Sequence, residues 1–341
     1  MRNETRSVFN GYTAQIAQLN GVDDVTKKFA VAPTIQQKLE QKIQESSDFL
    51  KKINMVPVTE MEGETVGIGV SGPTAGRTDT TQNDRQTRDL ANFESKKYKV
   101  VKTDFDTHIT YTKIDQWAKF PDFQAKIRDA ITKQQALDRI MIGWNGRSVA
   151  VQTDRAANPL LQDVNIGWLE HYRQDAPARV MKEVKAGTLK VKVGPTVAAA
   201  DGYKNLDALV FDAVNDLIDP IFSEDTGLVV ICGRQLLSDK YFPILNANQA
   251  PSEQLAADMV ISQKRMGNLP VVRVPYFPAN ALMITRLDNL SIYYQEGSRR
   301  RSIVDNSKRD RIENYESDNE AYVIENYALG CLVENIELVA G

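Results

Sequence analysis

Cysteine and histidine are scarce in this chain of 341 residues, which contains two of each. Cys232 and Cys331 lie far apart in apolar stretches, outside any CxxC pair or cysteine cluster, and we expect both to be buried, reduced thiols. His108 and His171 form no HxH or HExxH pattern, which argues against a histidine metal site and a catalytic triad. We expect His108 to lie in a strand over residues 105–111.

Long apolar runs are also absent. No run approaches the roughly 20 residues that cross a bilayer, so the sequence does not indicate a membrane protein. The residues after Met1–Arg6 are polar and amphipathic, whereas a secretory signal needs an uninterrupted apolar stretch. The sequence therefore predicts a protein that is made and used in the cytoplasm and has no membrane partner.

Neither sign of charge dominates the chain. The 42 basic and 45 acidic residues are interspersed and give a net charge of −3. A protein that recognises a DNA sequence usually carries a basic excess, so that function class gains little support. The apolar content of 42% predicts instead a substantial core in one large or two ordinary domains.

Two amphipathic helices are predicted in the first 54 residues. The first ends at Asn20–Gly21, and its apolar side chains are Val8, Tyr12, Ile16 and Leu19. The second follows Pro33, has Thr34 as its cap and ends before Pro57. Its apolar face consists of Ile35, Leu39, Ile43, Leu50 and Ile53. Each helix has a narrow apolar stripe, so both need partners to be stable.

A long two-stranded loop is predicted next, with arms at Val66–Val70 and Tyr98–Val101. Residues 71–92 between the arms have almost no large apolar side chains, so they are either disordered or packed on a neighbouring molecule. Gly67–Gly72 matches the G-x-G-x-x-G pattern of dinucleotide-binding turns. Because a polar loop follows where that fold requires a helix, we expect a glycine-rich strand and no cofactor site.

The strongest helix signal runs from Pro121–Asp122 to Gly146, with Asp122 as a cap. Most of its apolar side chains fall on one face, and they are Phe123, Ile127, Ile131, Leu137, Ile140, Met141 and Trp144. We expect this face to be buried and Lys133 to be exposed.

The remaining chain alternates helix and strand patterns, which predicts a mixed α/β unit. Helices are expected near residues 167–181, 206–217, 234–246 and 252–265. Strands are expected near residues 189–193, 228–232, 270–275, 281–286 and 290–294, the last three completing one unit. The tail returns to strands near residues 300–304, 309–315, 322–327 and 330–339.

Two charged patterns were considered as functional sites. Asp104 and Asp106 flank Phe105 and point to one strand face, but nearby lysines favour a solvated, charge-balanced strand over a paired-carboxylate site. Arg299–Arg301 is the densest basic run and could contact DNA phosphates. Downstream acidic residues make ion pairs within or between subunits the better interpretation. No catalytic, cofactor-binding or metal-binding residue is assigned.

Several segments resemble one known family. They are Gly267–Pro278, Asn289–Tyr294, Arg311–Ser317, Glu45–Leu50, Arg234–Pro243 and Ile261–Arg265. These segments are similar to the major capsid proteins of P2-like tailed phages, at matching places along nearly the whole chain. The resemblance implies an α+β chain with the Hong Kong 97-type capsid fold.

The resemblance also implies a division of the chain into five parts. They are an N-terminal arm (1–54), an extended β-hairpin loop (55–112), a peripheral domain with a long spine helix (113–202), an axial domain (203–295) and return strands of the peripheral domain (296–341). The spine helix would be the helix predicted over residues 121–146.

The function implied is that of a non-enzymatic structural protein of the virion. Its copies would form pentamers and hexamers of an icosahedral head, assembled in the bacterial cytoplasm. Expected partners are a scaffolding protein, a maturation protease, a portal protein and packaged double-stranded DNA bound without sequence specificity. The resemblance also implies removal of an N-terminal peptide, for which Phe29–Ala32 is the candidate region.

Two other functions stay open at this point. The same fold could form an encapsulin-like shell around a protein cargo. Residues 203–295 could instead belong to a nucleotide-dependent α/β enzyme. Particle size separates the enzyme from either shell, because a shell protein forms very large hollow assemblies.

Overall fold

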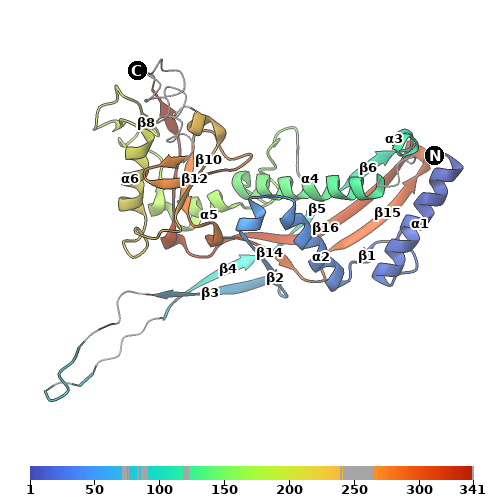
Figure 1. Cartoon of the computed structure of the whole chain (residues 1–341), viewed down its shortest axis with the longest axis horizontal. Helices are drawn as coiled ribbons and strands as arrows, with labels where there is room; N and C mark the ends of the chain where they lie inside the picture. The colour runs from blue at the N-terminus through green and yellow to red at the C-terminus, as the bar shows by residue number, and fades with distance from the viewer. Residues whose placement is uncertain are drawn as a thin grey trace, which may run out of the picture.

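The computed structural model describes residues 1–70, 75, 77–82, 84–85, 91–117, 123–238, 240 and 264–339. These residues form an elongated molecule (Figure 1). Helix α1 (Asn3–Asn20) lies at one end and α6 (Leu206–Leu217) at the other. A hairpin of β3 (Glu62–Val70) and β4 (Ala91–Lys99) projects from the middle. In the described part of the chain, no helix is long and apolar enough to span a bilayer.

The larger sheet has seven strands, in the order β1-β15-β16-β14-β2 with β5 and β6 also paired to β16. They are β1 (Phe29–Ala30), β2 (Asn54–Val58), β5 (Val101–Asp104), β6 (Thr107–Thr110), β14 (Leu290–Gln295), β15 (Arg300–Asn306) and β16 (Arg311–Ile324). Strand β16 is 14 residues long. It pairs with β15 and β6 along its first half and with β5 and β14 along its second half. Strand β2 runs parallel to β14.

The second sheet has six strands in the order β11-β12-β10-β13-β17-β7. They are β7 (Val180–Met181), β10 (Val229–Cys232), β11 (Arg265–Met266), β12 (Leu269–Arg273), β13 (Leu282–Thr285) and β17 (Cys331–Val333). A three-stranded parallel sheet consists of β8 (Val191–Val193), β9 (Gly202–Tyr203) and β18 (Ile336–Leu338). Helix α6 packs its apolar face against the six-stranded sheet and the three-stranded sheet in one core cluster.

The other α-helices of the described residues are α2 (Pro33–Glu45), α3 (Tyr111–Trp117), α4 (Phe123–Asn145) and α5 (Trp168–Asp175). Short 3₁₀ turns are η1 (Leu50–Lys52), η2 (Pro177–Arg179), η3 (Leu287–Asn289), η4 (Ser307–Arg309) and η5 (Tyr327–Leu329). Local chemistry explains several boundaries. Gly21 ends α1 in the left-handed conformation (φ 63°). Asn205 begins α6 by accepting a hydrogen bond from the amide of Ala208.

One aromatic core joins the two large sheets. Trp144 of α4 and Trp168 of α5 are both buried, with ring centroids 4.8 Å apart. Phe277 packs against Trp144 at 4.9 Å. Strands of both sheets contribute side chains to this core, including Ile292 of β14 and Met283 of β13. The two sheets are therefore parts of one packed unit around α4 and α5.

The first predicted helix is confirmed, including its end at Gly21. Its apolar face is only partly buried, because Val8 and Leu19 are 48% and 62% exposed. The second helix is shorter than predicted and ends at Glu45, where the hydroxyl of Ser46 donates to the carbonyl of Ile43.

Thr34 was wrongly predicted as the cap of the second helix. Ala32 occupies that position, because Pro33 lacks an amide N–H and fits the first turn of a helix. Leu50 and Ile53 are buried as expected, although they lie beyond the end of α2.

The predicted long helix is confirmed as α4, which spans 23 residues and ends before Gly146. The cap predicted at Asp122 lies outside the described residues. The buried face differs from the prediction, since Ile127 and Ile131 are only half-buried. They line an apolar pocket of about 100 Å³ together with Phe9 of α1. The face that is fully buried carries Gln135 and Arg139 beside Ile140.

The predicted helix near residues 167–181 ends at Asp175, because Pro177 cannot continue it. Of the short strand pair predicted near residues 189–193, the structure has the single strand β8. This strand runs parallel to β9, which follows it closely in the chain, and to β18, which is distant in sequence. Of the helices predicted over residues 234–246 and 252–265, the structure describes helix at residues 234–238 and 240, and residues 241–263 lie outside the described part of the chain.

Two predicted groupings of strands are wrong. Strand β14 belongs to the seven-stranded sheet and not to the sheet of β12 and β13. Strand β17 of the tail joins β13 in the six-stranded sheet. The segments near residues 309–315 and 322–327 are covered by the single strand β16, which continues through the polar residues between them.

The two-stranded loop is confirmed for its arms. Strands β3 and β4 pair from Glu62 with Lys99 to Val70 with Ala91. Half of the polar segment predicted over residues 71–92 lies outside the described residues, and its last two residues belong to β4.

Candidate functional site

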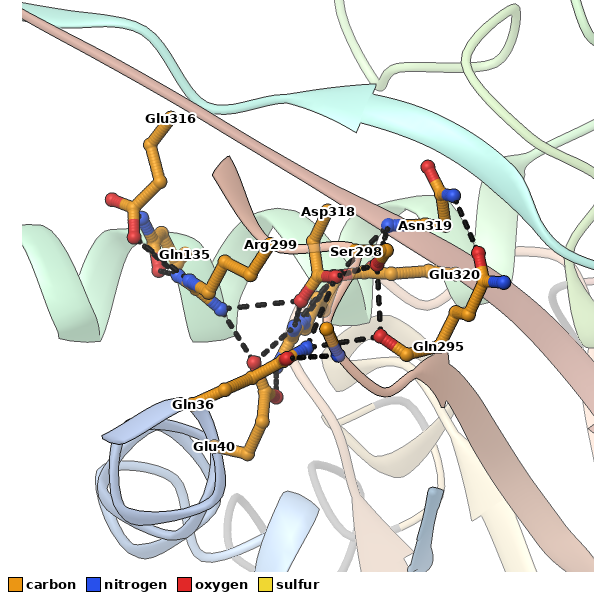
Figure 2. Close-up of polar contacts among 12 residues, drawn as sticks. Gln36, Glu40, Gln135, Gln295, Ser298, Arg299, Glu316, Asp318, Asn319 and Glu320 are labelled. Carbon is orange, nitrogen blue, oxygen red and sulfur yellow. Dashed lines mark hydrogen bonds and ion pairs between the residues drawn. The ribbon is translucent and has the colours of Figure 1, made fainter. Parts of the chain in front are cut away.

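A buried network of charged and polar side chains joins α2, α4, β16 and the turn before β15 (Figure 2). Its members, called the buried network below, are Gln36, Glu40, Gln135, Arg139, Arg299, Glu316, Asp318 and Glu320. None of these side chains is more than about 5% exposed. Charged residues are almost never fully buried unless they are paired, so this concentration marks a special position in the fold.

Helix and strand periodicity brings these side chains together. Gln36 and Glu40 are four residues apart on α2, and Gln135 and Arg139 are four apart on α4, so each pair shares one helix face. The acidic residues of β16 alternate along the strand and therefore point to one side of the sheet. The two helix faces meet that side of the sheet.

Arg139 connects α2 to β16 through α4. Its side chain is 0% exposed, and its Nη1 donates to Oε2 of Glu40 at 2.5 Å. Its Nε donates to Oε1 of Glu320 at 2.8 Å. The planar guanidinium thus binds a carboxylate on either side, a geometry that a lysine ammonium does not reproduce.

Arg299 makes the second set of connections and is also 0% exposed. Its Nε donates to Oε1 of Glu316 at 2.8 Å, and its Nη1 donates to Glu40. Gln135 closes this side of the network: its amide nitrogen donates to Glu316 at 3.0 Å, and its oxygen accepts from Arg299 at 2.9 Å. Glu40 is therefore held by both arginines.

Gln36 and Asp318 fix the turn that precedes β15. The oxygen of Gln36 accepts a hydrogen bond from the amide of Gly297 at 2.8 Å, and its nitrogen donates to the carbonyl of Gln295 at 3.1 Å. The hydroxyl of Ser298 donates to Asp318 at 2.9 Å. Helix α2 is thereby bonded to the turn through backbone as well as side-chain groups.

Carboxylates outnumber guanidiniums in the buried network, and the pKa values respond to that imbalance. Burial opposes ionisation of Glu40, but Arg139 and Arg299 outweigh it and hold its pKa below the ordinary value. Burial likewise opposes ionisation of Glu316, and Arg299 keeps its pKa low. For Asp318, burial and the neighbouring Glu40 charge raise the pKa to about 7.

Protonation of Asp318 relieves part of this charge. Burial and the charge of Glu40 favour the protonated carboxyl of Asp318 up to about pH 7, whereas the arginines keep the pKa values of Glu40 and Glu316 low. The arrangement therefore serves to hold four segments of chain together by ion pairs and hydrogen bonds.

The candidate acidic and histidine side chains are not members of the buried network, although Oδ1 of Asp106 accepts a hydrogen bond from the backbone amide of Glu316 at 3.3 Å. Asp104 pairs with Lys102 at 2.7 Å, as expected for a charge-balanced strand. His108 lies on β6, which confirms its strand assignment. His171 lies on α5, and its Nδ1 is 3.1 Å from Oδ2 of Asp175. Among the described residues, no group of three His, Cys, Asp or Glu side chains is arranged to hold a metal ion.

Gly67 and Gly69 lie in a strand and the two cysteines are buried, as expected from the sequence. Gly67 and Gly69 lie inside strand β3, so the turn and helix of a dinucleotide site do not follow them there. Both cysteines are buried, as predicted. Burial raises the pKa of the Cys232 thiol to about 11 and that of Cys331 to about 12, so both stay protonated near neutral pH.

Arg299 forms ion pairs, which confirms for this residue the interpretation of the run Arg299–Arg301 as ion-pairing residues. Its acidic partners all belong to the same chain. Arg301 donates to the side-chain oxygen of Asn314 at 2.7 Å. Sequence analysis missed the other half of the buried network, above all Glu40 and Arg139. No local signal marks Arg139 for burial, because its partners Glu40 and Glu320 are distant in the sequence.

Comparisons with known proteins find similarity over nearly the whole chain. A family model described as "Phage major capsid protein, P2 family" matches residues 8–336. The capsid protein of Escherichia phage P2 is 55% identical over 343 residues, which include 99% of this chain and 96% of that protein. The major capsid protein of Serratia phage KSP20 is 41% identical, covering 98% of this chain and 97% of that protein.

A solved structure extends the similarity to three dimensions. It is a chain from the satellite phage P4 procapsid that includes the size determination (Sid) protein. This chain is 51% identical to it with a TM-score of 0.82, and the match covers 100% of this chain and 99% of that one. The similarity confirms the Hong Kong 97-type capsid fold. The chain therefore belongs to the P2 family of phage major capsid proteins.

Proposed function

We propose that this chain builds an icosahedral phage head from pentamers and hexamers, and that the buried network fixes its N-terminal arm for that assembly. As a member of a major capsid protein family, the chain is a structural subunit of a phage head. The observation that carries the proposal is the full-length match to a procapsid chain at 51% identity. The buried network supports the second part, because Gln36 and Glu40 bond α2 to the rest of the subunit.

The division into arm, loop, peripheral and axial domains is part of this proposal. The seven-stranded sheet with α4 corresponds best to the peripheral domain, and the six-stranded sheet with α6 to the axial domain. Strand β14 then belongs to the peripheral side and β17 to the axial side. The boundary of the axial domain is therefore better drawn before residue 290 than at residue 295.

We infer further partners from the family alone: a scaffolding protein, a maturation protease, a portal protein and packaged double-stranded DNA. The near-neutral charge supports contact with DNA without sequence specificity, because a strongly basic wall would bind the genome tightly through counterion release. Removal of the N-terminal peptide near Phe29–Ala32 requires a conformational change, since Phe29 and Ala30 pair with β15. The intact mass of subunits from mature heads tests this cleavage.

Purified full-length protein tests the shell assignment directly. We expect it to elute as very large assemblies and to form hollow particles in negative-stain electron microscopy. A small oligomer as the final state would favour the enzyme alternative. Nuclease-resistant DNA in particles from infected cells would separate a phage head from a protein-filled, encapsulin-like shell.

A further inference from the structure

Helix α6 presents an apolar and acidic face to solvent. Its inner face is buried in the core, but Phe211 on the outer side is 66% exposed. Residues three and four positions apart are neighbours on a helix surface, so Ala208 and Asn215 flank Phe211. The helix contains Asp207, Asp212 and Asp216 and no basic residue. Asp207 pairs with Lys240 at 2.6 Å, and Asp212 accepts a hydrogen bond from the hydroxyl of Tyr203, which leaves Phe211 and Asp216 as the exposed apolar and acidic side chains of this surface.

A second unusual surface lies at the same end of the molecule, in the turn between β7 and β8 (Figure 1). Leu189 has a φ of 49° and is 64% exposed. A bulky residue with positive φ is strained, and the strain is absent for glycine and reduced for asparagine. Because Leu189 gains little burial within its own chain, its side chain is retained at a cost to the subunit. Strain of this kind concentrates at functional sites.

The turn is closed by a side-chain hydrogen bond and is rich in lysine. Residues 182–192 contain four lysines and one acidic residue, Glu183. The Glu183 carboxylate accepts a hydrogen bond from the amide of Leu189 at 2.8 Å, so it is occupied in closing the turn. Lys185 and Lys190 lie on either side of Leu189 and form exposed ion pairs with Asp201 and Glu337, both at 3.1 Å. Exposed pairs of this type are weak and exchange readily.

We propose that Leu189 and its flanking lysines dock on the Phe211 face of α6 in a neighbouring copy of this chain. Each surface has an exposed apolar side chain beside charged residues. These residues are acidic on α6 and basic in the turn. Because the two surfaces are different, the contact is head-to-tail, and contacts of this type generate rings when the rotation closes. The inference rests on the proposed function and deepens it, since it names one contact by which subunits form pentamers and hexamers.

The apolar part of the contact is tested by Leu189→Asn. Asparagine tolerates positive φ, so the folded subunit should melt at or above the temperature of the wild type while shell yield falls at least tenfold. Leu189→Met is the matched control, because it keeps a large apolar side chain at the same strained position, and it should assemble. Normal shells from Leu189→Asn would overturn the proposal, as would equal loss with Leu189→Met.

The charged part is tested by two double variants. Asn215→Lys/Asp216→Lys makes the α6 face basic, and Lys185→Glu/Lys190→Glu makes the turn acidic. Each variant alone opposes like charges in every contact, so neither should assemble. An equal mixture restores opposite charges wherever the two variants alternate around a ring. We expect the mixture to form sedimenting assemblies that neither variant forms alone.

The alternation of the two variants around a ring also predicts the shape of the assemblies. A strictly alternating ring closes only with an even number of subunits, so hexamers can form and pentamers cannot. The mixture should therefore give flat sheets or open tubes instead of closed heads in electron micrographs. Failure of the mixture to assemble better than its components would overturn the head-to-tail contact. A wild type that forms no shells under the same conditions would overturn the proposed function and this proposal with it.

Discussion

Arg139 and Arg299 place two guanidiniums where solvent does not reach, and each depends on carboxylates from other segments. Removing one partner of a buried ion pair leaves an uncompensated charge and typically costs about 3 to 5 kcal/mol. An apolar core of the same volume would be no less stable, so the network is better explained by the single position it imposes on α2. This interpretation predicts that substitutions at different residues of the buried network change the stability of the subunit in different ways.

Arg139→Met should lower the free energy of unfolding of unassembled subunits by about 3 to 5 kcal/mol, because Glu40 and Glu320 lose their shared partner. Denaturant unfolding measures the change. Arg128→Met on the same helix is the matched control, since Arg128 is 51% exposed and pairs only with its neighbour Asp129 among the described residues. It should change stability by less than about 0.5 kcal/mol. Equal stability of the two variants would contradict the role of Arg139.

The pKa of Asp318 makes a pH-dependent prediction. Its pKa of about 7 in the folded protein exceeds the ordinary value of 3.8 for an aspartate, so the folded state binds the extra proton. This contribution to stability is complete below about pH 4 and is lost as pH rises through about 7. Glu40 and Glu316 have lowered pKa values and act oppositely, losing their contribution as pH falls below about 4.5.

Asp318→Asn removes the carboxyl group that binds this proton. Comparison with the wild type therefore isolates the effect of Asp318 protonation on stability. Relative to the variant, the wild type should lose stability between about pH 4.5 and about pH 7, by up to about 1.4 kcal/mol for each pH unit. Urea midpoints of both proteins across that range provide the measurement. Other groups that face Asp318 are Glu40, Glu320, Tyr294 and the two buried arginines, and all are unchanged in the comparison. Parallel midpoint curves would show that Asp318 keeps its ordinary pKa.

At the scale of elements, sequence periodicity predicted where α1, α4 and α6 run, because their apolar spacing and terminal glycine or asparagine residues are local signals. It did not predict which side of α4 is buried. Gln135 and Arg139 look exposed to a periodicity argument, and only the acidic residues of β16, which are distant in sequence, make their burial possible. The half of the buried network that was missed consists of such long-range pairs.

The observed burial of α4 predicts unequal effects along that helix. Ile140 is 0% exposed, so Ile140→Ala should cost about 2 to 5 kcal/mol through lost burial and a new cavity. Ile131 lines the pocket beside α1 and is only half-buried, so Ile131→Ala should cost less. Lys133 is exposed, and Lys133→Glu should be close to neutral. Melting of unassembled subunits provides the ranking, and a larger loss for Ile131 than for Ile140 would mean that α4 buries another face.

At the scale of the whole molecule, the sequence resemblance supplied what local patterns could not: the family, the capsid fold and the shell. Local patterns placed β14 with β12 and β13 because the three strands follow one another in the chain. The structure separates them because β14 pairs with β2 and β16 across large sequence distances. Register between distant strands is set by the packing of whole sheets, which a short window of sequence does not contain.

The projecting hairpin is predicted to act between molecules. Val70 pairs with Ala91, so residues 71–90 can be replaced by an Asn–Gly turn that closes β3 and β4 directly. We expect the shortened subunit to stay soluble, with the melting temperature of the wild type, and to form no closed shells. Size-exclusion chromatography and electron microscopy of both proteins give the result. Normal heads from the shortened chain would contradict an assembly role for this segment.

Strand β16 and helix α4 run side by side along the length of the subunit (Figure 1). With about 3.3 Å per strand residue, β16 extends for about 46 Å and is bonded to other strands on both sides. Tension along the subunit would load the hydrogen bonds of β15, β6, β5 and β14 in shear, many at once, instead of opening them one after another. In a head that resists outward pressure from its contents, this arrangement would make the subunit stiff along its long axis.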